Sequence, residues 1–123
     1  ISDLSPLSGL TSLLGLRLAG NSFIDLSPLR GLATLEYLEL TGNDITDITP
    51  LSGLTNLMAL DLRFNPELTN IQALFENPGL GAGDIVELRH TNVSCVDQAL
   101  LADKGVEVRT ELFSSCATAT RQR

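Results

Sequence analysis

A nine-residue pattern, L-x-x-L-x-L-x-x-N, occurs three times in this chain at one constant interval. It covers residues 13–21, 35–43 and 57–65. In each copy the central L-x-L alternates apolar and polar residues, which is the period of a strand with one buried face. A constant interval of this order indicates stacked repeats of one structural unit. Each unit is therefore predicted to supply one short strand to a parallel sheet.

The three units that carry the pattern, 1–22, 23–44 and 45–66, align without gaps. Each also contains apolar-x-Asp-apolar-Ser/Thr-Pro-Leu-x-Gly-Leu. Roughly seven aliphatic side chains per unit point to one interior, and burying each contributes about 1.5 to 3 kcal/mol. Because one unit alone cannot bury them, the units must stack on one another. The sequence predicts an α/β solenoid with a parallel sheet on its concave face and 3₁₀ or short helical turns on its convex face.

Polar residues predict how the turns are held. Gly20 and Gly42 suit a positive φ. A short amide that could bond buried backbone recurs at Asn21, Asn43 and Asn65. A hydroxyl cap before a proline that opens a short helix is predicted at Ser5, Ser27 and Thr49. A column of Asp3, Asp25 and Asp47 could indicate calcium, but one carboxylate per unit without a local cluster favours turn capping.

The fourth and fifth units, 67–92 and 93–116, depart from the regular spacing. Leu88 follows Leu62 at more than the regular interval, because Pro66-Glu67 and the stretch from Phe75 to Asp84 lengthen this unit. The glycines of that stretch, Gly79, Gly81 and Gly83, resemble a phosphate-binding loop, but no Lys-Ser/Thr follows and an insertion is favoured.

The fifth unit predicts a strand at Val106-Glu107-Val108, which places Val108 after Leu88 at less than the regular interval. Its polar residues indicate a terminal unit that covers the open core. Residues 117–123 are small and polar, which predicts a mobile tail.

Composition narrows the functional classes. The chain has 8 Lys plus Arg against 15 Asp plus Glu, a formal net charge of −7 that disfavours nucleic acid and anionic membranes as partners. No apolar run approaches the about 18 residues of a membrane-spanning helix, and no signal peptide is evident. With His90 as the single histidine and no C-x-x-C pair, a metal site is disfavoured, and no cofactor motif is found. No nucleophile, base and oxyanion donor can be assembled, so we expect no enzyme activity.

The two cysteines, Cys95 and Cys116, both lie near the C-terminus. A disulfide between them would contribute about 3 kcal/mol by restricting the unfolded chain, and it would hold the tail over the last unit. Two buried free thiols are the alternative.

The repeated segments resemble a known family. Residues 1–66 are similar to the 22-residue class of leucine-rich repeats in bacterial internalins and in regulatory subunits of eukaryotic protein phosphatases. The matching residues are I-T-D-I-T-P-L at 45–51 and Leu57, Leu60, Leu62 and Asn65. Residues 74–108 resemble the closing segment of bacterial leucine-rich repeat proteins, through G-L-G-A-G-D at 79–84 and V-E-L-R at 86–89.

The resemblance implies a short right-handed coil of about five rungs, forming one domain over 1–116. It also implies a non-enzymatic module that binds a protein or peptide on the concave face. We expect a secreted or cell-surface bacterial protein, with a cytoplasmic location as the alternative.

The outward-facing strand positions predict three rows of side chains. Read unit by unit, these are Gly15, Tyr37, Ala59, Ile85 and Gly105; Arg17, Glu39, Asp61, Glu87 and Glu107; and Ala19, Thr41, Arg63, Arg89 and Arg109. Neighbouring strands are about 4.8 Å apart, so an acidic row would lie against a basic one. The predicted partner-binding residues are Arg17, Tyr37, Glu39, Asp61, Arg63, Ile85, Glu87, Arg89, Glu107 and Arg109.

Two alternatives stay open for this face and for the chain. The charged rows could simply neutralise each other, since each exposed ion pair contributes only about 0 to 1 kcal/mol. The chain could also be a structural spacer or a self-assembling segment of a larger surface protein. A homodimer could form through an uncapped first rung, where Ile1, Leu4 and Leu7 would lie open.

Overall fold

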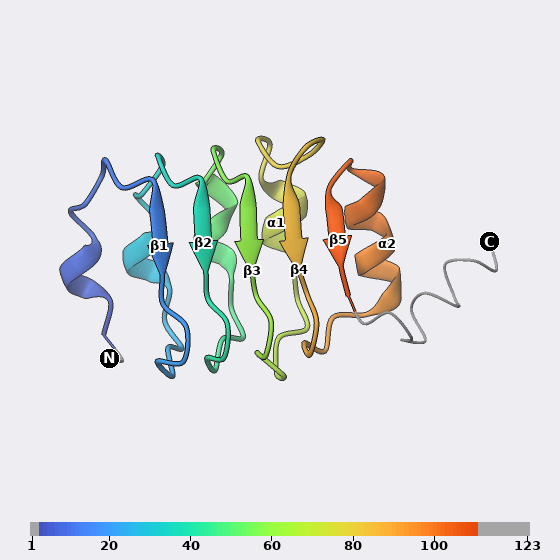
Figure 1. Ribbon diagram of the computed structural model, residues 1–123, viewed down its shortest axis with the longest axis horizontal. Coiled ribbons are helices and arrows are strands. Elements are labelled where there is room, and N and C mark those ends of the chain that lie inside the picture. The colour runs from blue at the N-terminus through green and yellow to red at the C-terminus, as the bar shows by residue number, and fades with distance from the viewer. Residues whose placement is uncertain (1–2, 111–123) are drawn as a thin grey trace.

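The computed structural model describes residues 3–110 and contains a single parallel sheet (Figure 1). Its five strands lie side by side in chain order, one from each unit. Their bounds are β1 (Gly15–Arg17), β2 (Tyr37–Glu39), β3 (Ala59–Asp61), β4 (Ile85–Glu87) and β5 (Glu107–Arg109). Equivalent residues of neighbouring units pair, so Leu16, Leu38 and Leu60 form one continuous row. The predicted solenoid of five rungs is confirmed.

Short helices return the chain on the other side of the sheet, behind the strands in Figure 1. The first three rungs use 3₁₀ helices, and the last two use α-helices. Their bounds are η1 (Ser5–Leu7), η2 (Ser27–Leu29), η3 (Thr49–Gly53), α1 (Gln72–Glu76) and α2 (Cys95–Asp103). Each 3₁₀ helix has a proline in its first turn, where the fixed φ suits a helix and the missing N–H leaves no donor unpaired.

The core lies between the sheet and the helices and is almost entirely aliphatic. Phe23 and Leu38 are fully buried, and Leu60 is 1% exposed. Burying side chains of this size contributes about 1.5 to 3 kcal/mol each, and every rung uses its neighbours as walls. The stack of rungs is thus the source of stability.

Asparagine side chains hold the turns that follow β2 and β3. Asn65 is fully buried, and its Nδ2 donates to the carbonyls of Leu62 (2.9 Å) and Leu40 (3.0 Å). Its Oδ1 accepts from the backbone N–H of Ile45 at 3.2 Å. Asn43 makes the equivalent bonds one rung earlier. Each amide therefore joins its own rung to the preceding one.

Carboxylates, and not hydroxyls, cap the 3₁₀ helices. Asp25 Oδ1 accepts from the backbone N–H (2.9 Å) and the hydroxyl (2.5 Å) of Ser27, and Asp3 and Asp47 make the same pair of bonds two residues ahead. The predicted hydroxyl caps are wrong, because a charged carboxylate is the stronger acceptor and the hydroxyl becomes its donor. The hydrogen bonds from Ser27 lower the pKa of Asp25. The predicted turn-capping role of the aspartates is confirmed.

The stretch that lengthens the fourth rung leads from the end of α1 into a loop that packs tightly against the third rung. Asn77 is fully buried, and its Nδ2 donates to the carbonyls of Leu51 (3.1 Å) and Leu54 (3.0 Å). Gly79 follows so closely that an added Cβ would lie 2.0 Å from the carbonyl oxygen of Thr55. The glycine is required by this contact with backbone, in keeping with the preferred insertion and not with a phosphate site.

A lysine of the fifth rung closes the end of α1. Lys104 Nζ donates to the carbonyls of Leu74 (2.8 Å), Phe75 (3.2 Å) and Asn77 (2.5 Å). The last carbonyls of a helix have no partner within the helix and carry partial negative charge, so an ammonium group stabilises them. The fourth and fifth rungs are thereby joined through side chain and backbone.

The fifth rung differs from its prediction in register. Val108 pairs with Val86 and not with Leu88, so this pair of strands keeps the sequence interval of the regular units. Gly105 has φ 100° and lies against the backbone of Ala82, and Val106 enters the core (4% exposed) before the strand begins. Val106, which the sequence predicts as the first residue of the strand, is thus a core residue.

At both ends of the chain, the described residues can be compared with what the sequence predicts. Leu4 is 2% exposed, so the expectation that it lies open is wrong; among the described residues of the first rung, Leu10 (46%) and Leu14 (59%) are the large exposed apolar residues. Cys95 is the first residue of α2. Its possible partner Cys116, Ile1 and the tail 117–123 lie outside the described residues, and the disulfide stays a prediction.

Candidate binding surface

The sheet face carries two rows of outward side chains. The outer row consists of Gly15, Tyr37, Ala59, Ile85 and Glu107, and the central row consists of Arg17, Glu39, Asp61, Glu87 and Arg109. Glu107 and Arg109 each stand one row away from their predicted places, because of the register of β5. The central row therefore holds three carboxylates with an arginine at each end, instead of four carboxylates.

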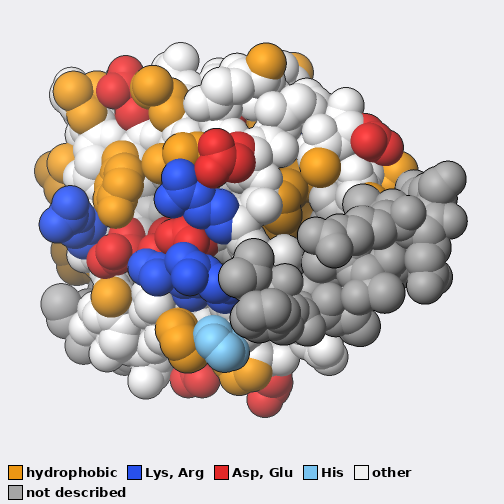
Figure 2. Space-filling view, turned by 45° about the vertical axis from the view of Figure 1, so that its right-hand side comes forward, with side chains coloured by type: hydrophobic (Ala, Val, Ile, Leu, Met, Phe, Trp, Pro, Cys, Tyr) orange, Lys and Arg blue, Asp and Glu red, His pale blue; other side chains and the backbone are white. Residues whose placement is uncertain are grey.

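Two arginines after the strands bind two of the three carboxylates in the central row, Asp61 and Glu87. Arg63 Nε and Nη2 form a fork on Asp61, at 2.9 Å from Oδ1 and 2.7 Å from Oδ2. Arg63 Nε also lies 3.5 Å from Glu87 Oε2, and Arg89 Nη2 pairs with Glu87 Oε1. This bidentate geometry, with Asp61 only 8% exposed, fixes the orientation of the guanidinium groups. Figure 2 shows the basic and acidic side chains interleaved on this face.

The environment of Asp61 makes stability depend on pH. Burial raises its pKa, but hydrogen bonds from the side chain and backbone N–H of Arg63 and the charge of Arg63 outweigh this and lower the pKa below 3.8. The unfolded chain then binds the proton more readily, so the stabilisation is complete above pH 3.8 and is lost as pH falls through the folded pKa.

We expect Asp61→Asn to reduce the loss of unfolding free energy that occurs as the pH falls. Urea unfolding of both proteins at neutral pH and below 3.8 measures it, and equal acid slopes would contradict it.

The ends of the rows hold more exposed pairs. Arg109 Nε donates to Glu107 Oε2 at 2.8 Å, with about half of each side chain exposed. At the other end, the Arg17 guanidinium lies 5.4 Å from the centre of the Tyr37 ring. An exposed cation–π contact contributes about 0.5 to 1 kcal/mol, so these groups can rearrange when a partner binds.

A hollow of about 230 Å³ opens on the sheet face between these groups. Its walls are Tyr37 and Ile85, separated by the small side chain of Ala59, and Asp61, Glu87 and Arg109 form its polar side. The carboxylates are already paired with Arg63 and Arg89, so the hollow presents apolar walls and satisfied charges. It has room for one apolar side chain of a partner.

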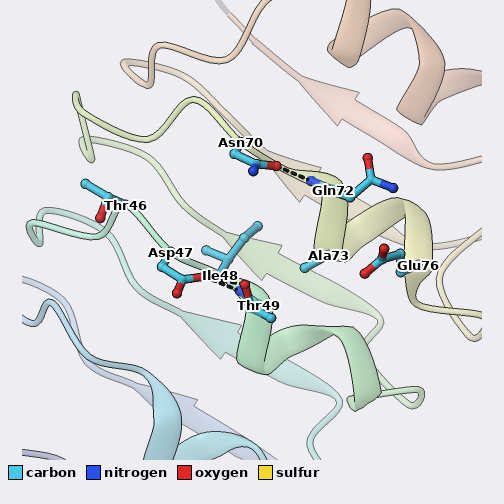
Figure 3. Close-up of a pocket in the computed structure, with 8 residues that line it drawn as sticks. All are labelled: Thr46, Asp47, Ile48, Thr49, Asn70, Gln72, Ala73 and Glu76. Carbon is cyan, nitrogen blue, oxygen red and sulfur yellow. Dashed lines mark hydrogen bonds between the residues drawn. The ribbon is translucent and has the colours of Figure 1, made fainter.

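A second cleft, of about 430 Å³, lies on the helical side between η3 and α1 (Figure 3). Asp47, Asn70, Gln72 and Glu76 are among its lining residues. Two of its polar side chains already form hydrogen bonds within the protein: Asp47 caps η3, and Asn70 Oδ1 accepts the N–H of Gln72 at 2.9 Å. Within residues 3–110 no three His, Cys, Asp or Glu side chains gather where they could hold a metal ion.

Four residues occupy the same position in the turns that follow β1 to β4. Gly20, Gly42, Phe64 and His90 have φ between 59° and 70°. The N–H groups of the first three donate to Thr41, Arg63 and Arg89 carbonyls of the next rung, which places them in register. A side chain in this backbone conformation costs about 1 to 2 kcal/mol. Phe64 and His90 carry this conformational cost, whereas the first two rungs have glycine at the same position.

The two side chains at this turn position form an aromatic stack. The rings of Phe64 and His90 lie 4.4 Å apart between centroids at an angle of 20°, and Phe64 is 50% exposed. An aromatic pair contributes about 0.5 to 1.5 kcal/mol, which is less than the two strained residues cost together. This pair was not predicted from the sequence, although Phe64 and His90 align with Gly20 and Gly42 in the repeat.

Comparison with known proteins shows the protein family. A family model described as leucine-rich repeats (2 copies) matches residues 33–76. The chain superposes on internalin C2 of Listeria monocytogenes with a TM-score of 0.74 and 32% identity, over 90% of this chain and 47% of that one. It is a leucine-rich repeat protein. It superposes equally on the internalin InlF of the same organism, with a TM-score of 0.74 and 28% identity, over 93% of this chain and 34% of that one. No curated protein sequence matches it significantly.

The leucine-rich repeat chain therefore spans less than half the length of these two internalins. Leucine-rich repeat domains generally act as protein-interaction modules and are typically without enzyme activity. In the described part of the chain, no helix has the length and apolarity needed to cross a lipid bilayer.

Proposed function

We propose that the leucine-rich repeat binds a protein or peptide partner on its sheet face, with an apolar side chain of the partner seated in the hollow between Tyr37 and Ile85. The hollow carries the proposal. It combines an aromatic wall, an aliphatic wall and ion pairs that are already formed, which resembles the apolar centre and polar rim of protein interfaces. Partner binding there leaves no charge unpaired.

The charge distribution supports the same face. Four arginines and four carboxylates stand on its described part, so the formal charge of −7 resides in the rest of the chain; these residues are Arg17, Arg63, Arg89, Arg109, Glu39, Asp61, Glu87 and Glu107. The sheet face is thus a neutral region on an acidic molecule. Nucleic acid is disfavoured as a partner, and a neutral or basic protein is favoured.

Filling the hollow tests the proposal without removing an existing contact. Peptides are first selected on the unaltered protein from a phage-displayed library of random twelve-residue sequences. We expect Ala59→Phe to weaken the selected peptides about tenfold or more, because the new ring occupies the space of the partner's side chain. Affinity is measured by fluorescence polarisation.

The matched control fills the other cleft with the same ring, by Gln72→Phe. If Ala59→Phe weakens binding and Gln72→Phe leaves the affinity unchanged, the peptides bind the sheet face. If only Gln72→Phe weakens binding, they bind the helical side. Light scattering on the same samples examines the alternative, a spacer or self-assembling segment with a homodimer through the first rung. The exposure of Leu10 and Leu14 motivates it, and a mass that rises with concentration would favour it.

We further propose that the chain belongs to a secreted or cell-surface bacterial protein. The support is its likeness to the two Listeria internalins. Fractionation of the source cells with an antibody to this domain tests the location, and signal confined to the cytoplasm would favour the cytoplasmic alternative.

A further inference from the structure

The aromatic stack of Phe64 and His90 continues the sheet face at the edge where the strands end. One face of the Phe64 ring is covered by His90. Because the two stacked rings come from equivalent positions of neighbouring rungs, we infer that the opposite face of the Phe64 ring points along the stack toward the preceding rung, where the equivalent residue is Gly42. A Cβ added to Gly42 would meet only the backbone of Gly20 within 4 Å among the described residues. The space beside the Phe64 ring therefore has a bare backbone floor and one flat aromatic wall.

The charges around this space select the kind of group that fits it. Asp44, two residues after Gly42, is exposed. The two arginines next to the stack in the sequence, Arg63 and Arg89, are paired with Asp61 and Glu87, so their charges are balanced. Figure 2 shows the histidine beside a hydrophobic side chain at the edge of the molecule, with acidic side chains close by. A flat cation can stack on the ring, and the exposed carboxylate of Asp44 adds negative charge to the segment that follows Gly42.

We propose that Phe64 and Gly42 form a slot for the guanidinium group of an arginine from the protein partner. The inference rests on the proposed function, since it adds a second contact to the same partner surface. A planar guanidinium continues the stack that Phe64 and His90 begin, whereas a lysine ammonium has no flat face. The strained backbone at Phe64 then has a purpose, because it places a ring where glycine would leave no wall.

The test uses three blocked peptides, Gly-Arg-Gly, Gly-Lys-Gly and Gly-Phe-Gly, titrated into the full chain. The amide resonance of Gly42 and the ring resonances of Phe64 are followed by NMR. We expect the arginine peptide to shift both and to bind about threefold or more tightly than the lysine peptide. Phe64→Leu keeps the apolar volume but removes the π-face, and it should abolish the Gly42 shift.

A second variant guards against loss of the fold. Phe64→Gly suits the positive φ and should unfold at the same or a higher temperature than the unaltered protein while losing the arginine response. Met58→Leu, at another exposed apolar side chain, is the matched control and should leave the response unchanged. Equal shifts from all three peptides, a stronger response to the phenylalanine peptide, or a response that survives in Phe64→Leu would overturn the proposal. Ala59→Phe leaves the slot intact, so failure in the hollow and failure here are separate results.

Discussion

Replacing Gly79 by alanine is expected to destabilise the protein by about 3 kcal/mol, because the added methyl group overlaps backbone that cannot move away cheaply. The Cβ would lie 2.0 Å from the carbonyl oxygen and 2.7 Å from the carbonyl carbon of Thr55. The loop must shift as a whole, and Asn77 would then lose its bonds to Leu51 and Leu54. Thermal unfolding should show a midpoint lower by roughly 10 to 20 °C.

Gly53→Ala is the matched control for this substitution. Nothing lies within 4 Å of a Cβ added to Gly53, and its φ is not in the left-handed region. Alanine there should be neutral or stabilise by about 0.4 to 1 kcal/mol, since it restricts the unfolded chain. If Gly79→Ala unfolded at the same temperature as Gly53→Ala, the close packing of the fourth-rung loop on the third rung would be refuted.

Asn65→Ala is expected to cost about 3 kcal/mol or more, because two buried backbone groups lose their partner. These are the carbonyl of Leu62 and the N–H of Ile45, whereas the carbonyl of Leu40 keeps its second bond, from Asn43. Each buried unpaired group costs about 1 to 3 kcal/mol, and the alanine also leaves space where the amide was. Urea unfolding followed by circular dichroism gives the free energy of unfolding.

Asn56→Ala supplies the comparison for Asn65. Asn56 is exposed and its Nδ2 donates to the Ala33 carbonyl at 2.8 Å, so it also joins neighbouring rungs, but water can replace it. Its loss should cost no more than about 0.5 kcal/mol. Equal losses for the two variants would show that burial of the amide does not matter, contrary to the structure.

The regular part of the fold could be predicted because its buried leucines recur at one constant interval. Leu16, Leu38 and Leu60 recur at that interval, and a strict repeat of buried positions has few structural solutions. The sheet, its strand order and its outward side chains on the first four rungs follow from that spacing. The pairing of Asp61 with Arg63 was foreseeable only as two adjacent rows, since the fork between them depends on side-chain rotamers.

The irregular rungs could not be predicted in the same way. Val106 and Val108 both fit an alternating strand, and the choice between them depends on Gly105 packing against Ala82 from another rung. The hollow depends on Ala59 lying between two larger neighbours, Tyr37 and Ile85, together with the register of Arg109. Contacts between distant segments decide these points, and no local pattern records them.

The bond network of Lys104 has a consequence for how the solenoid unfolds. The ammonium group belongs to the fifth rung and its three carbonyl partners belong to the fourth, so neither rung can open without breaking the other's terminal contacts. The two C-terminal rungs should therefore exchange their amide hydrogens as one cooperative unit.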